Sequence, residues 1–427
     1  MEFNANKSNS LRGEITIPSD KSMSHRAVMF NSLATGKAKI SNFLMGEDCL
    51  STISVLKKLG SKINIDREGN VITNGLGMNS LKEPKQILNV GNSGTTIRLM
   101  SGVLAGRKFR SILDGDESIR RRPMGRVVKP LSMMGAIIKA KNNNENAPIE
   151  FRGGELTKIN YAMPVASAQL KSALILAGLR SKDGITINQP ALSRDHTERL
   201  LGFMGATIKT KGLNIQVKPS EINAVDVIIP GDISSASYWL VAGCIHQNAD
   251  LTIKNVGINE TRSGIISVLN RMGANIKMSN KLDYSGEPVC DINISTSNLK
   301  ATTISGEEIP LLIDEIPIIA LAAVFAEGET KILDAEELRY KESDRITLTV
   351  EWMRKAGAQI EELQDGMIIQ GNSKITGGKF SSHGDHRLAM TLGIASLISE
   401  KAIEIENSEV SNVSYPKFWE TLELIGN

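Results

Sequence analysis

The chain has 427 residues, which is long enough for two domains of ordinary size. A formal net charge of +3 and an aromatic content of 4% argue against the basic tracks and stacking surfaces on which nucleic-acid binding depends, and they give no general attraction to a membrane. The three cysteines form no CxxC pair, the N-terminus lacks a signal-peptide pattern, and no apolar run reaches the roughly 20 residues of a membrane span, so we expect a cytoplasmic protein with reduced thiols.

One phrase recurs along the chain at intervals of about seventy residues. It reads KKLGSKI, SMMGAII, GFMGATI, NRMGANI, RKAGAQI and, at the C-terminal end, LELIGN. Each copy ends an amphipathic pattern, as where Ile346, Val350, Met353 and Gly357 share one helical face. We therefore predict six half-exposed helices, each ended by a glycine in the left-handed conformation and followed by a short alternating strand.

A second kind of helix is predicted between these copies. Its segments are apolar nearly all round and rich in Ala, Gly and Ser, which is typical of a helix buried on every side. They cover residues 24–36, 94–106, 167–179, 234–245, 314–328 and 385–399. A strand pattern follows each, the first being AKISNF and the last AIEIEN. The sequence thus indicates six mixed α/β units, each with one buried and one half-exposed helix.

Six units divide naturally into two domains of three. The fourth buried helix begins after Pro230 and Gly231, which suits a crossing between domains. The N-terminal strand precedes the first unit and is free to join the last three, which puts a second crossing near Pro18 and Ser19. We predict an N-terminal domain of residues 19–229 and a discontinuous second domain of residues 1–18 plus 230–427.

Charged and polar residues collect where the buried helices begin. Cations are disfavoured at the positive end of a helix dipole, yet Lys21, Arg26, Arg98 and Arg387 occupy equivalent places there. Helix N-termini also present unpaired N–H groups, which favour anions. If several of these ends face one cleft, they make an anion trap.

Other polar residues at these positions have two explanations. Ser234 and Ser235 are explained at least as well by helix capping, and Asp314 also has a capping explanation beside a catalytic one. In GNSGTT (residues 91–96) the spacing of a nucleotide-binding P-loop is missing.

Arginines recur 11 to 13 residues before the repeated glycines. We expect inward-facing positions for Arg122, Arg194 and Arg345, whereas a structural salt bridge is an equally good account of Arg262. The neighbours of Arg122 in the run IRRRP are expected to form a solvated face.

The segment RYKESDRI carries Lys341, Glu342 and Arg345. If its helix begins at Lys341 or just after, Lys341 and Arg345 lie on one side with Glu342 beside them, although an exposed ion-pair network would look the same. His383 and His386 lack a third partner that would complete a metal site, and no nucleophile motif is present. The residue set indicates anion binding and general acid–base chemistry without metal or cofactor.

Taken together, these motifs closely resemble the 3-phosphoshikimate 1-carboxyvinyltransferase (EPSP synthase) family. The matching segments occur in the family's order and cover essentially the whole chain: IPSDKSMSHR, GNSGTTIRL, GDESIRRRPMGR, PVASAQLKSAL, SRDHTE, GDISSAS, LLIDEIP, KESDRI and GDHRLAM. The resemblance implies an inside-out α/β barrel of two domains, each with three βαβαββ units that place helices inside and sheets outside. This agrees with the sixfold count made from the repeats.

The resemblance also implies a transferase that moves the enolpyruvyl group of phosphoenolpyruvate to the 5-hydroxyl of shikimate 3-phosphate and releases phosphate. That step belongs to the shikimate pathway, which leads to chorismate and the aromatic amino acids. The expected partners are these two small molecules, bound with closure of the domains, and we expect a monomer.

The resemblance carries over to particular residues. The positions that match shikimate 3-phosphate contacts are Lys21, Ser22, Arg26, Ser167, Gln169, Arg194, Asp314 and Lys341. Those that match phosphoenolpyruvate contacts are Lys21, Gly94, Arg122, Gln169, Arg345 and Arg387. Asp314 matches the family's proton acceptor, and Glu342 and Lys21 are candidates for the remaining proton transfers.

The chain departs from many members of the family at Leu99, Ala168 and Val413. Val413 stands where many members have a lysine, and no role passes to Lys417. Two alternatives are a UDP-N-acetylglucosamine enolpyruvyl transferase, whose mobile loop usually has a cysteine that GDESIRRRPMG lacks, and a nucleic-acid-binding or 3′-phosphate-processing repeat protein.

Overall fold

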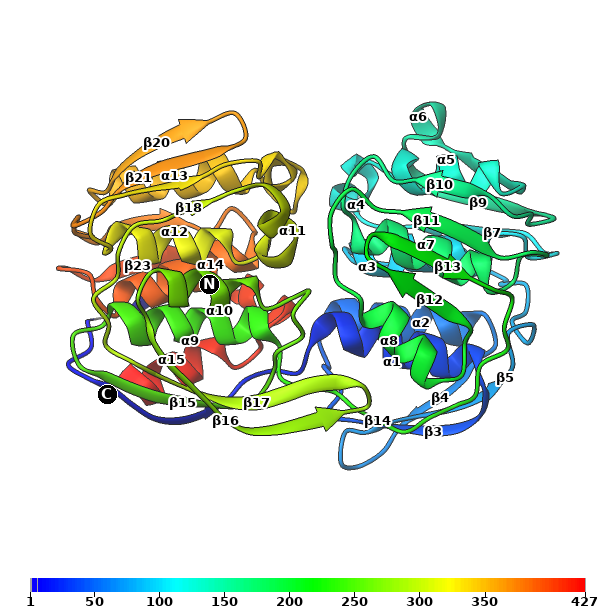
Figure 1. Cartoon of the computed structure of the whole chain (residues 1–427), viewed down its shortest axis with the longest axis horizontal. Coiled ribbons are helices and arrows are strands. Elements are labelled where there is room, and N and C mark those ends of the chain that lie inside the picture. Colours follow the sequence, from blue (N-terminus) through cyan, green and yellow to red (C-terminus); the bar gives the residue numbers. More distant parts are fainter. Residues whose placement is uncertain (1, 6, 427) are drawn as a thin grey trace. The chain divides into compact units, whose positions relative to one another are not determined.

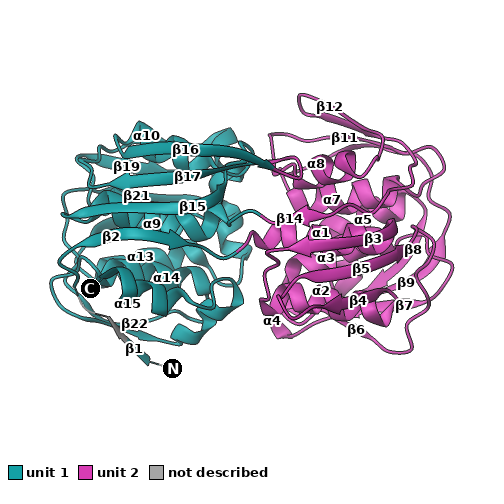
Figure 2. Ribbon diagram, turned by 90° about the horizontal axis from the view of Figure 1, so that it is seen from below, with its two compact units in different colours: residues 1–18, 230–283, 288–427 teal, residues 19–229, 284–287 magenta. Residues whose placement is uncertain are grey.

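The fold is known from a computed structural model that describes residues 2–5 and 7–426. The chain groups into two compact units (Figure 2). Unit 1 comprises residues 1–18, 230–283 and 288–427, and unit 2 comprises residues 19–229 and 284–287. Each unit has its own buried apolar core.

Unit 2 contains three four-stranded sheets, in the orders β14-β3-β5-β4, β6-β7-β9-β8 and β10-β11-β13-β12. The strands of the first sheet are β3 (Thr35–Ser41), β4 (Lys62–Ile65), β5 (Val71–Leu76) and β14 (Val227–Ile228). The second sheet has β6 (Leu88–Asn89), β7 (Ser111–Asp114), β8 (Ala136–Ala140) and β9 (Asn146–Gly154). The third has β10 (Asn160–Ala162), β11 (Ile185–Asn188), β12 (Ile208–Lys211) and β13 (Asn214–Val217). In each sheet one outer pair is parallel and the other pairs are antiparallel.

The helices of unit 2 are of two kinds. Nearly every residue is buried in α1 (Lys21–Leu33), α3 (Gly94–Leu104) and α7 (Ala168–Gly178). The half-exposed helices are α2 (Glu47–Lys58), α5 (Gly125–Met133) and α8 (His196–Phe203), with the shorter α4 (Glu117–Arg121) and α6 (Lys141–Asn144) beside them. The sheets wrap around the buried helices (Figure 1). Small residues permit this packing, since a Cβ on Gly102 of α3 would lie 2.1 Å from the carbonyl oxygen of Ala173 in α7.

Unit 1 repeats this plan. Its sheets have the orders β16-β17-β15-β2, β18-β19-β21-β20 and β1-β23-β22. The first is formed by β2 (Leu11–Thr16), β15 (Ala249–Gly257), β16 (Asn275–Tyr284) and β17 (Glu287–Ser295). The second is formed by β18 (Thr303–Ile304), β19 (Glu329–Ile332), β20 (Gln359–Leu363) and β21 (Gly366–Gln370). The third is formed by β1 (Glu2–Ala5), β22 (Gly378–Ser381) and β23 (Ile403–Glu406).

The buried helices of unit 1 are α9 (Ile233–Ile245), α12 (Ile316–Val324) and α14 (His386–Ser396), which pack against one another. Its half-exposed helices are α10 (Gly264–Arg271), α13 (Arg345–Lys355) and α15 (Phe418–Gly426). Short turns complete it: α11 (Ile309–Leu312), η1 (Gly306–Glu308), η2 (Glu336–Tyr340) and η3 (Ser408–Val413). Among the helices described, none is both long and apolar enough to cross a membrane.

The predicted fold class is confirmed, with two kinds of helix alternating through mixed sheets in both units. The predicted left-handed glycines also occur after five of the six half-exposed helices. Their φ angles are +94° at Gly60, +104° at Gly135, +96° at Gly205, +91° at Gly273 and +97° at Gly357. A side chain is strained in this region, which is why glycine stands at the helix ends.

Candidate active site

The first buried helix of unit 2 begins with the predicted Lys21 and Ser22. Asp20 caps it, accepting a hydrogen bond of 2.7 Å from the Met23 N–H. The Nζ atom of Lys21 lies 3.3 Å from Oδ2 of Asp48, at the start of α2. The Lys21 side chain is 18% exposed, so it is held at the helix start but remains accessible.

Arg26 lies one turn further along α1 and is buried. Its guanidinium donates to three neutral acceptors: Thr197 Oγ1 at 2.7 Å, Ser172 Oγ at 2.9 Å and the Ser22 carbonyl at 2.9 Å. Burial lowers the pKa of Arg26 to about 10, so the group stays charged at neutral pH, and Arg194 is close enough to contribute to the lowering. The guanidinium is thus oriented by hydroxyl and carbonyl groups, and no carboxylate of the described residues forms an ion pair with it.

The starts of α3 and α7 are joined by side chains. Arg98 Nη1 donates to Gln169 Oε1 at 2.6 Å, and Gln169 Nε2 donates to Thr95 Oγ1 at 3.1 Å. The predicted Ser167 is the cap of α7, where its hydroxyl accepts from the Leu170 N–H at 3.4 Å. The capping explanation therefore applies to Ser167, while Gln169 is fixed by its neighbours.

Gly94 is the first residue of α3 and lies under the predicted Arg122. A Cβ at Gly94 would be 2.8 Å from Arg122 Nη1 and 3.2 Å from Arg98 Nη1. The Nη2 atom of Arg122 donates to Asn92 Oδ1 at 2.8 Å and to Ser118 Oγ at 3.2 Å. Two guanidinium groups therefore approach the backbone closely at this helix start, and a side chain at Gly94 would displace them.

A buried chain of hydroxyl groups, which the sequence analysis missed, connects α1 with α3. His25 Nδ1 lies 2.7 Å from Thr52 Oγ1, which lies 2.6 Å from Thr96 Oγ1, which lies 2.7 Å from Ser93 Oγ. Ser93 is the N-cap of α3 and so supports Gly94. Burial lowers the pKa of His25 to about 3, and the imidazole is therefore neutral. The sequence shows Ser, Thr and His near the starts of these helices, but it does not show which of them are hydrogen-bonded, because the partners lie on different helices.

Lys171 is a second residue that the sequence analysis did not use. It lies within α7 and is buried, with Nζ 2.7 Å from Glu198 Oε1 and 2.9 Å from the Ser193 carbonyl. This pair ties α7 to α8 beside Thr197, the hydroxyl that orients Arg26. A lysine inside an otherwise aliphatic helix was its sequence signal.

Unit 1 gathers the other predicted residues around Asp314, which precedes α12. Asp314 Oδ1 lies 3.4 Å from Lys341 Nζ and 3.4 Å from Arg345 Nη1, and its Oδ2 lies 3.8 Å from Arg387 Nη2. The Asp314 side chain is 15% exposed. One accessible carboxylate therefore contacts three predicted cations.

Arg345 is bonded to carboxylates on both sides. Its Nε donates to Asp385 Oδ2 at 2.8 Å, and its Nη2 donates to Glu342 Oε2 at 2.7 Å. Burial alone would raise the pKa of Asp385, but Arg345 outweighs it and holds that pKa below its usual value. Asp385 also caps α14, accepting from the Arg387 N–H at 2.8 Å. Asp385 therefore fixes the position of Arg345 as well as the start of α14.

The side chain of Arg387 is held more loosely. It is buried, and its guanidinium lies 3.8 Å from both Asp314 and Glu315. It forms no hydrogen bond with any residue in the part of the chain that the structure describes. Burial would lower the pKa of Arg387, but the carboxylates around it raise it, so the group stays charged.

The structure corrects two sequence interpretations. The helix of RYKESDRI begins at Arg345 with Asp344 as its cap, so Lys341 lies before the helix, and Lys341 and Arg345 both contact Asp314. Asp344 accepts from two N–H groups of the first turn, and this prevents an earlier start.

Ser234 and Ser235 are not the caps of α9, because Asp232 accepts the 2.8 Å bond from the Ser234 N–H and both serines lie inside the helix. Two other expectations are confirmed. Arg262 forms the salt bridges that were one of its two explanations, and Arg120 is 52% exposed with Asp114 as its partner.

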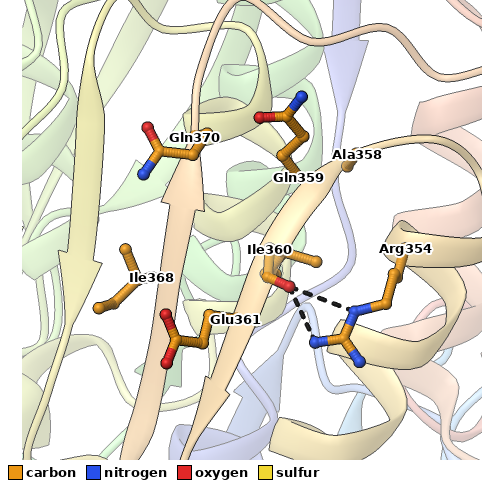
Figure 3. A pocket seen from close by; sticks show the side chains of 7 residues that line it. All are labelled: Arg354, Ala358, Gln359, Ile360, Glu361, Ile368 and Gln370. Atoms are coloured by element: carbon orange, nitrogen blue, oxygen red, sulfur yellow. Dashed lines mark hydrogen bonds between the residues drawn. The ribbon is translucent and has the colours of Figure 1, made fainter.

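A surface hollow of about 440 Å³ lies elsewhere, over β20 and β21 (Figure 3). It is lined by Arg354, Ala358, Gln359, Ile360, Glu361, Ile368 and Gln370. The Arg354 guanidinium donates to the carbonyl oxygen of Ile360, at 2.9 Å from Nη2. None of the predicted site residues lines this hollow. Among the described residues no group of three or more His, Cys, Asp or Glu is placed to hold a metal ion.

The fold and the residues described above define a class of protein: an α/β protein with two similar units, each of which places cations at the starts of buried helices. The family model for EPSP synthase (3-phosphoshikimate 1-carboxyvinyltransferase) matches residues 5–422, and the chain belongs to that family.

Curated relatives are similar over nearly their whole length. A 3-phosphoshikimate 1-carboxyvinyltransferase of Bacillus subtilis is 50% identical over 418 residues, which are 97% of each chain. One of Shouchella clausii is 49% identical over 415 residues, which are 97% of this chain and 96% of the relative.

Solved structures agree. An EPSP synthase from Acinetobacter baumannii has a TM-score of 0.89 and 39% identity and covers 100% of this chain and 98% of its own. The enolpyruvyl transferase NikO from Streptomyces tendae, at 16% identity and a TM-score of 0.82 over 99% of this chain and 97% of its own, shares the fold.

Proposed function

We propose that this chain transfers the enolpyruvyl group of phosphoenolpyruvate to the 5-hydroxyl of shikimate 3-phosphate and releases inorganic phosphate. The observation that carries the proposal is the family match over residues 5–422. The clusters of unit 1 and unit 2 add chemical support, because both substrates carry a phosphate and a carboxylate, and guanidinium groups pair with these anions in bidentate geometry. The reaction supplies the pathway to chorismate and the aromatic amino acids.

We assign shikimate 3-phosphate to one set of residues. In unit 2 it consists of Lys21, Ser22, Arg26, Ser167, Gln169 and Arg194, and in unit 1 of Asp314 and Lys341. Arg26 supports this assignment, because its bonds to neutral groups orient a buried cation that forms no ion pair with any carboxylate of the described residues. Such a cation is strongly attractive to a phosphate.

We assign phosphoenolpyruvate to a second set, which shares Lys21 and Gln169 with the first. Its other members are Gly94, Arg122, Arg345 and Arg387. The hydrogen-bonding capacity of Arg387 is unused by the described residues, which suits a group that awaits an anion. Gly94 leaves room for Arg122 and offers the N–H groups of a helix start.

The chemistry requires addition followed by elimination. The 5-hydroxyl oxygen bonds to C2 of phosphoenolpyruvate as the hydroxyl proton leaves and a proton reaches C3. The tetrahedral intermediate then loses a C3 proton and breaks the bond between C2 and the phosphate oxygen, which restores the double bond. We propose Asp314 as the base for the hydroxyl proton, and Glu342 and Lys21 for the transfers at C3 and at the leaving phosphate.

The surroundings of Asp314 support this role. Lys341 and Arg345 hold its Oδ1 from two directions, so the carboxylate has a fixed orientation while its side chain remains 15% exposed. Glu342 is bonded to Arg345, with a side chain that is 27% exposed. A base and a second acid–base group thus share one arginine that keeps them in place.

An assay of phosphate release from phosphoenolpyruvate tests the proposal directly. We expect turnover with shikimate 3-phosphate as the acceptor and none with UDP-N-acetylglucosamine. Turnover with the second acceptor alone would assign the chain to the other enolpyruvyl transfer, and turnover with neither would refute the proposal. We also propose a monomer that works in the cytoplasm, which sedimentation and cell fractionation would check.

A matched pair of arginines tests the assignment of residues. Arg122→Ala should weaken phosphoenolpyruvate binding severely, because its guanidinium lies over Gly94. Arg120→Ala should be nearly silent, because Arg120 is 52% exposed and pairs with Asp114 at 2.7 Å. Equal effects of the two substitutions on KM for phosphoenolpyruvate would contradict the assignment.

A further inference from the structure

A buried ionic network lies beside Arg387 in unit 1, and none of the roles assigned above uses it. Glu315 is fully buried at the start of α12, and Arg262 is 3% exposed. Arg262 Nη1 lies 2.9 Å from Glu315 Oε1, and its Nη2 lies 3.3 Å from Asp232 Oδ1. Ser234 donates its hydroxyl to the same Oε1 atom and is also contacted by Arg262.

Arg387 approaches the same oxygen of Glu315 but does not reach it. The distance from Arg387 Nη1 to Glu315 Oε1 is 3.8 Å, which is longer than a hydrogen bond. The Oε1 atom already has two donors, the guanidinium of Arg262 and the hydroxyl of Ser234. Arg262 and Arg387 are therefore two cations beside one buried carboxylate, and Arg262 holds it.

The neighbouring Arg345 shows the contrasting arrangement. Its carboxylate partners Asp385 and Glu342 lie at hydrogen-bond distance and occupy its guanidinium. A buried carboxylate without a cation is costly, so a free one draws in the nearest available cation. For Glu315 that cation would be Arg387 if Arg262 were absent.

We propose that Arg262 is a positioning residue that occupies Glu315 and so keeps the Arg387 guanidinium open for the anionic group of phosphoenolpyruvate. The inference rests on the proposed function for the identity of that anion. Without Arg262, the Arg387 side chain closes onto Glu315, and phosphoenolpyruvate has to compete with an internal carboxylate for the same guanidinium. Arg262 thereby affects the binding of phosphoenolpyruvate through Glu315 and Arg387, without contacting phosphoenolpyruvate itself.

The first experiment compares KM values of Arg262→Gln with those of the wild-type protein. We expect KM for phosphoenolpyruvate to rise at least about tenfold, the effect of losing one charge-assisted contact, with KM for shikimate 3-phosphate within about twofold of the wild-type value. An unchanged KM for phosphoenolpyruvate in a folded variant, or an equal rise in both KM values, would overturn the inference. Arg271→Gln is the matched control, since Arg271 also lies in unit 1 and pairs with Glu308, but is 42% exposed. It should leave both KM values unchanged.

A second substitution separates positioning from stability. In the double variant Arg262→Gln with Glu315→Gln, the carboxylate that would capture Arg387 is gone, and KM for phosphoenolpyruvate should return to within about threefold of the wild-type value. The double variant also carries no unpaired buried charge at these two positions, so it tests the inference even if Arg262→Gln alone does not fold. If the folded double variant keeps the high KM for phosphoenolpyruvate, Glu315 does not compete with phosphoenolpyruvate for Arg387.

A crystal structure of the folded variant gives a readout that needs no turnover. In Arg262→Gln, Arg387 should lie within hydrogen-bond distance of Glu315, in place of 3.8 Å. If the wild-type protein releases no phosphate from phosphoenolpyruvate, the proposed function fails, and this distance still decides whether Arg262 positions Arg387. An unmoved Arg387 would overturn the inference whatever the activity.

Discussion

Replacement of Gly94 by alanine tests the geometry at the start of α3. The new methyl group would lie 2.8 Å from Arg122 Nη1, whereas ordinary contact begins near 3.4 Å. The guanidinium therefore has to move by about 0.6 Å. Because the obstacle is the end of a flexible side chain rather than backbone, the helix accommodates the substitution and the arginine is displaced.

The size of the effect follows from what Arg122 contributes. A displaced guanidinium loses the alignment of a charge-assisted hydrogen bond, which is worth roughly 1.5 to 3 kcal/mol. That loss corresponds to a rise in KM for phosphoenolpyruvate of roughly tenfold to a hundredfold. Stability should not fall, because alanine is a better helix former than glycine and Gly94 has no left-handed φ angle.

The assay measures phosphate release over a range of phosphoenolpyruvate concentrations at saturating shikimate 3-phosphate, together with the urea-unfolding free energy. Gly202→Ala is the control, because Gly202 lies within α8 and a Cβ there meets nothing within 4 Å. It should gain about 0.5 to 1 kcal/mol of stability and leave KM unchanged. An unchanged KM in Gly94→Ala, or a rise explained by partial unfolding, would refute the argument that Gly94 makes room for Arg122.

Three further predictions concern buried groups. The pKa of His25 is lowered by burial from 6.5 to about 3, so the unfolded chain takes up a proton below pH 6.5 that the folded chain does not. The unfolding free energy should fall from pH 6.5 toward pH 4 by up to about 1.4 kcal/mol per pH unit. His25→Asn should reduce this pH dependence. Equal pH dependence of the wild-type protein and the variant in urea titrations would contradict the prediction. Lys171→Met should lower the free energy of unfolding by about 3 to 5 kcal/mol, because it leaves Glu198 unpaired in the interior. Adding Glu198→Leu should restore most of this loss, as measured by urea unfolding. If the double variant shows no recovery, the loss of the pair is not the cause. All three cysteines are buried, and burial raises the pKa of Cys244 to about 12 and that of Cys290 to about 11. The native protein should therefore not react with a thiol reagent until it unfolds. A rapid reaction of the native protein would contradict the burial of these thiols.

Periodic features of this fold were predictable from the sequence because they depend on neighbours in the chain. The left-handed glycines after the half-exposed helices and the apolar segments of the buried helices are examples. The start of α13 differs from the one considered in the sequence, at Lys341 or just after, because Asp344 caps the helix and Arg345 is its first residue. Lys341 therefore lies before the helix, where it contacts Asp314.

Pairings across the fold were not predictable, and several of them control the predicted site residues. Arg26 bonds to Thr197, 171 positions away, and Arg262 bonds to Glu315, 53 positions away. Composition predicts that buried cations need partners, but only the packing of buried helices selects the partner. The assignment of Arg262 between a site role and a salt bridge was open for this reason.

The choice of partners distinguishes the chemistry of the clusters in the two units. In unit 2, Arg26 is oriented by two hydroxyl groups and a carbonyl, which accept three of its N–H hydrogen bonds and are all neutral. In unit 1, Arg345 is bonded to Asp385 and Glu342, so its charge is largely balanced. An arginine of the first kind keeps its charge available to an anion, whereas one of the second kind also fixes the positions of its carboxylate partners. Arg387 belongs fully to neither kind, because its carboxylate neighbours stay at 3.8 Å. Its capacity to bind an anion therefore depends on how firmly another cation holds Glu315.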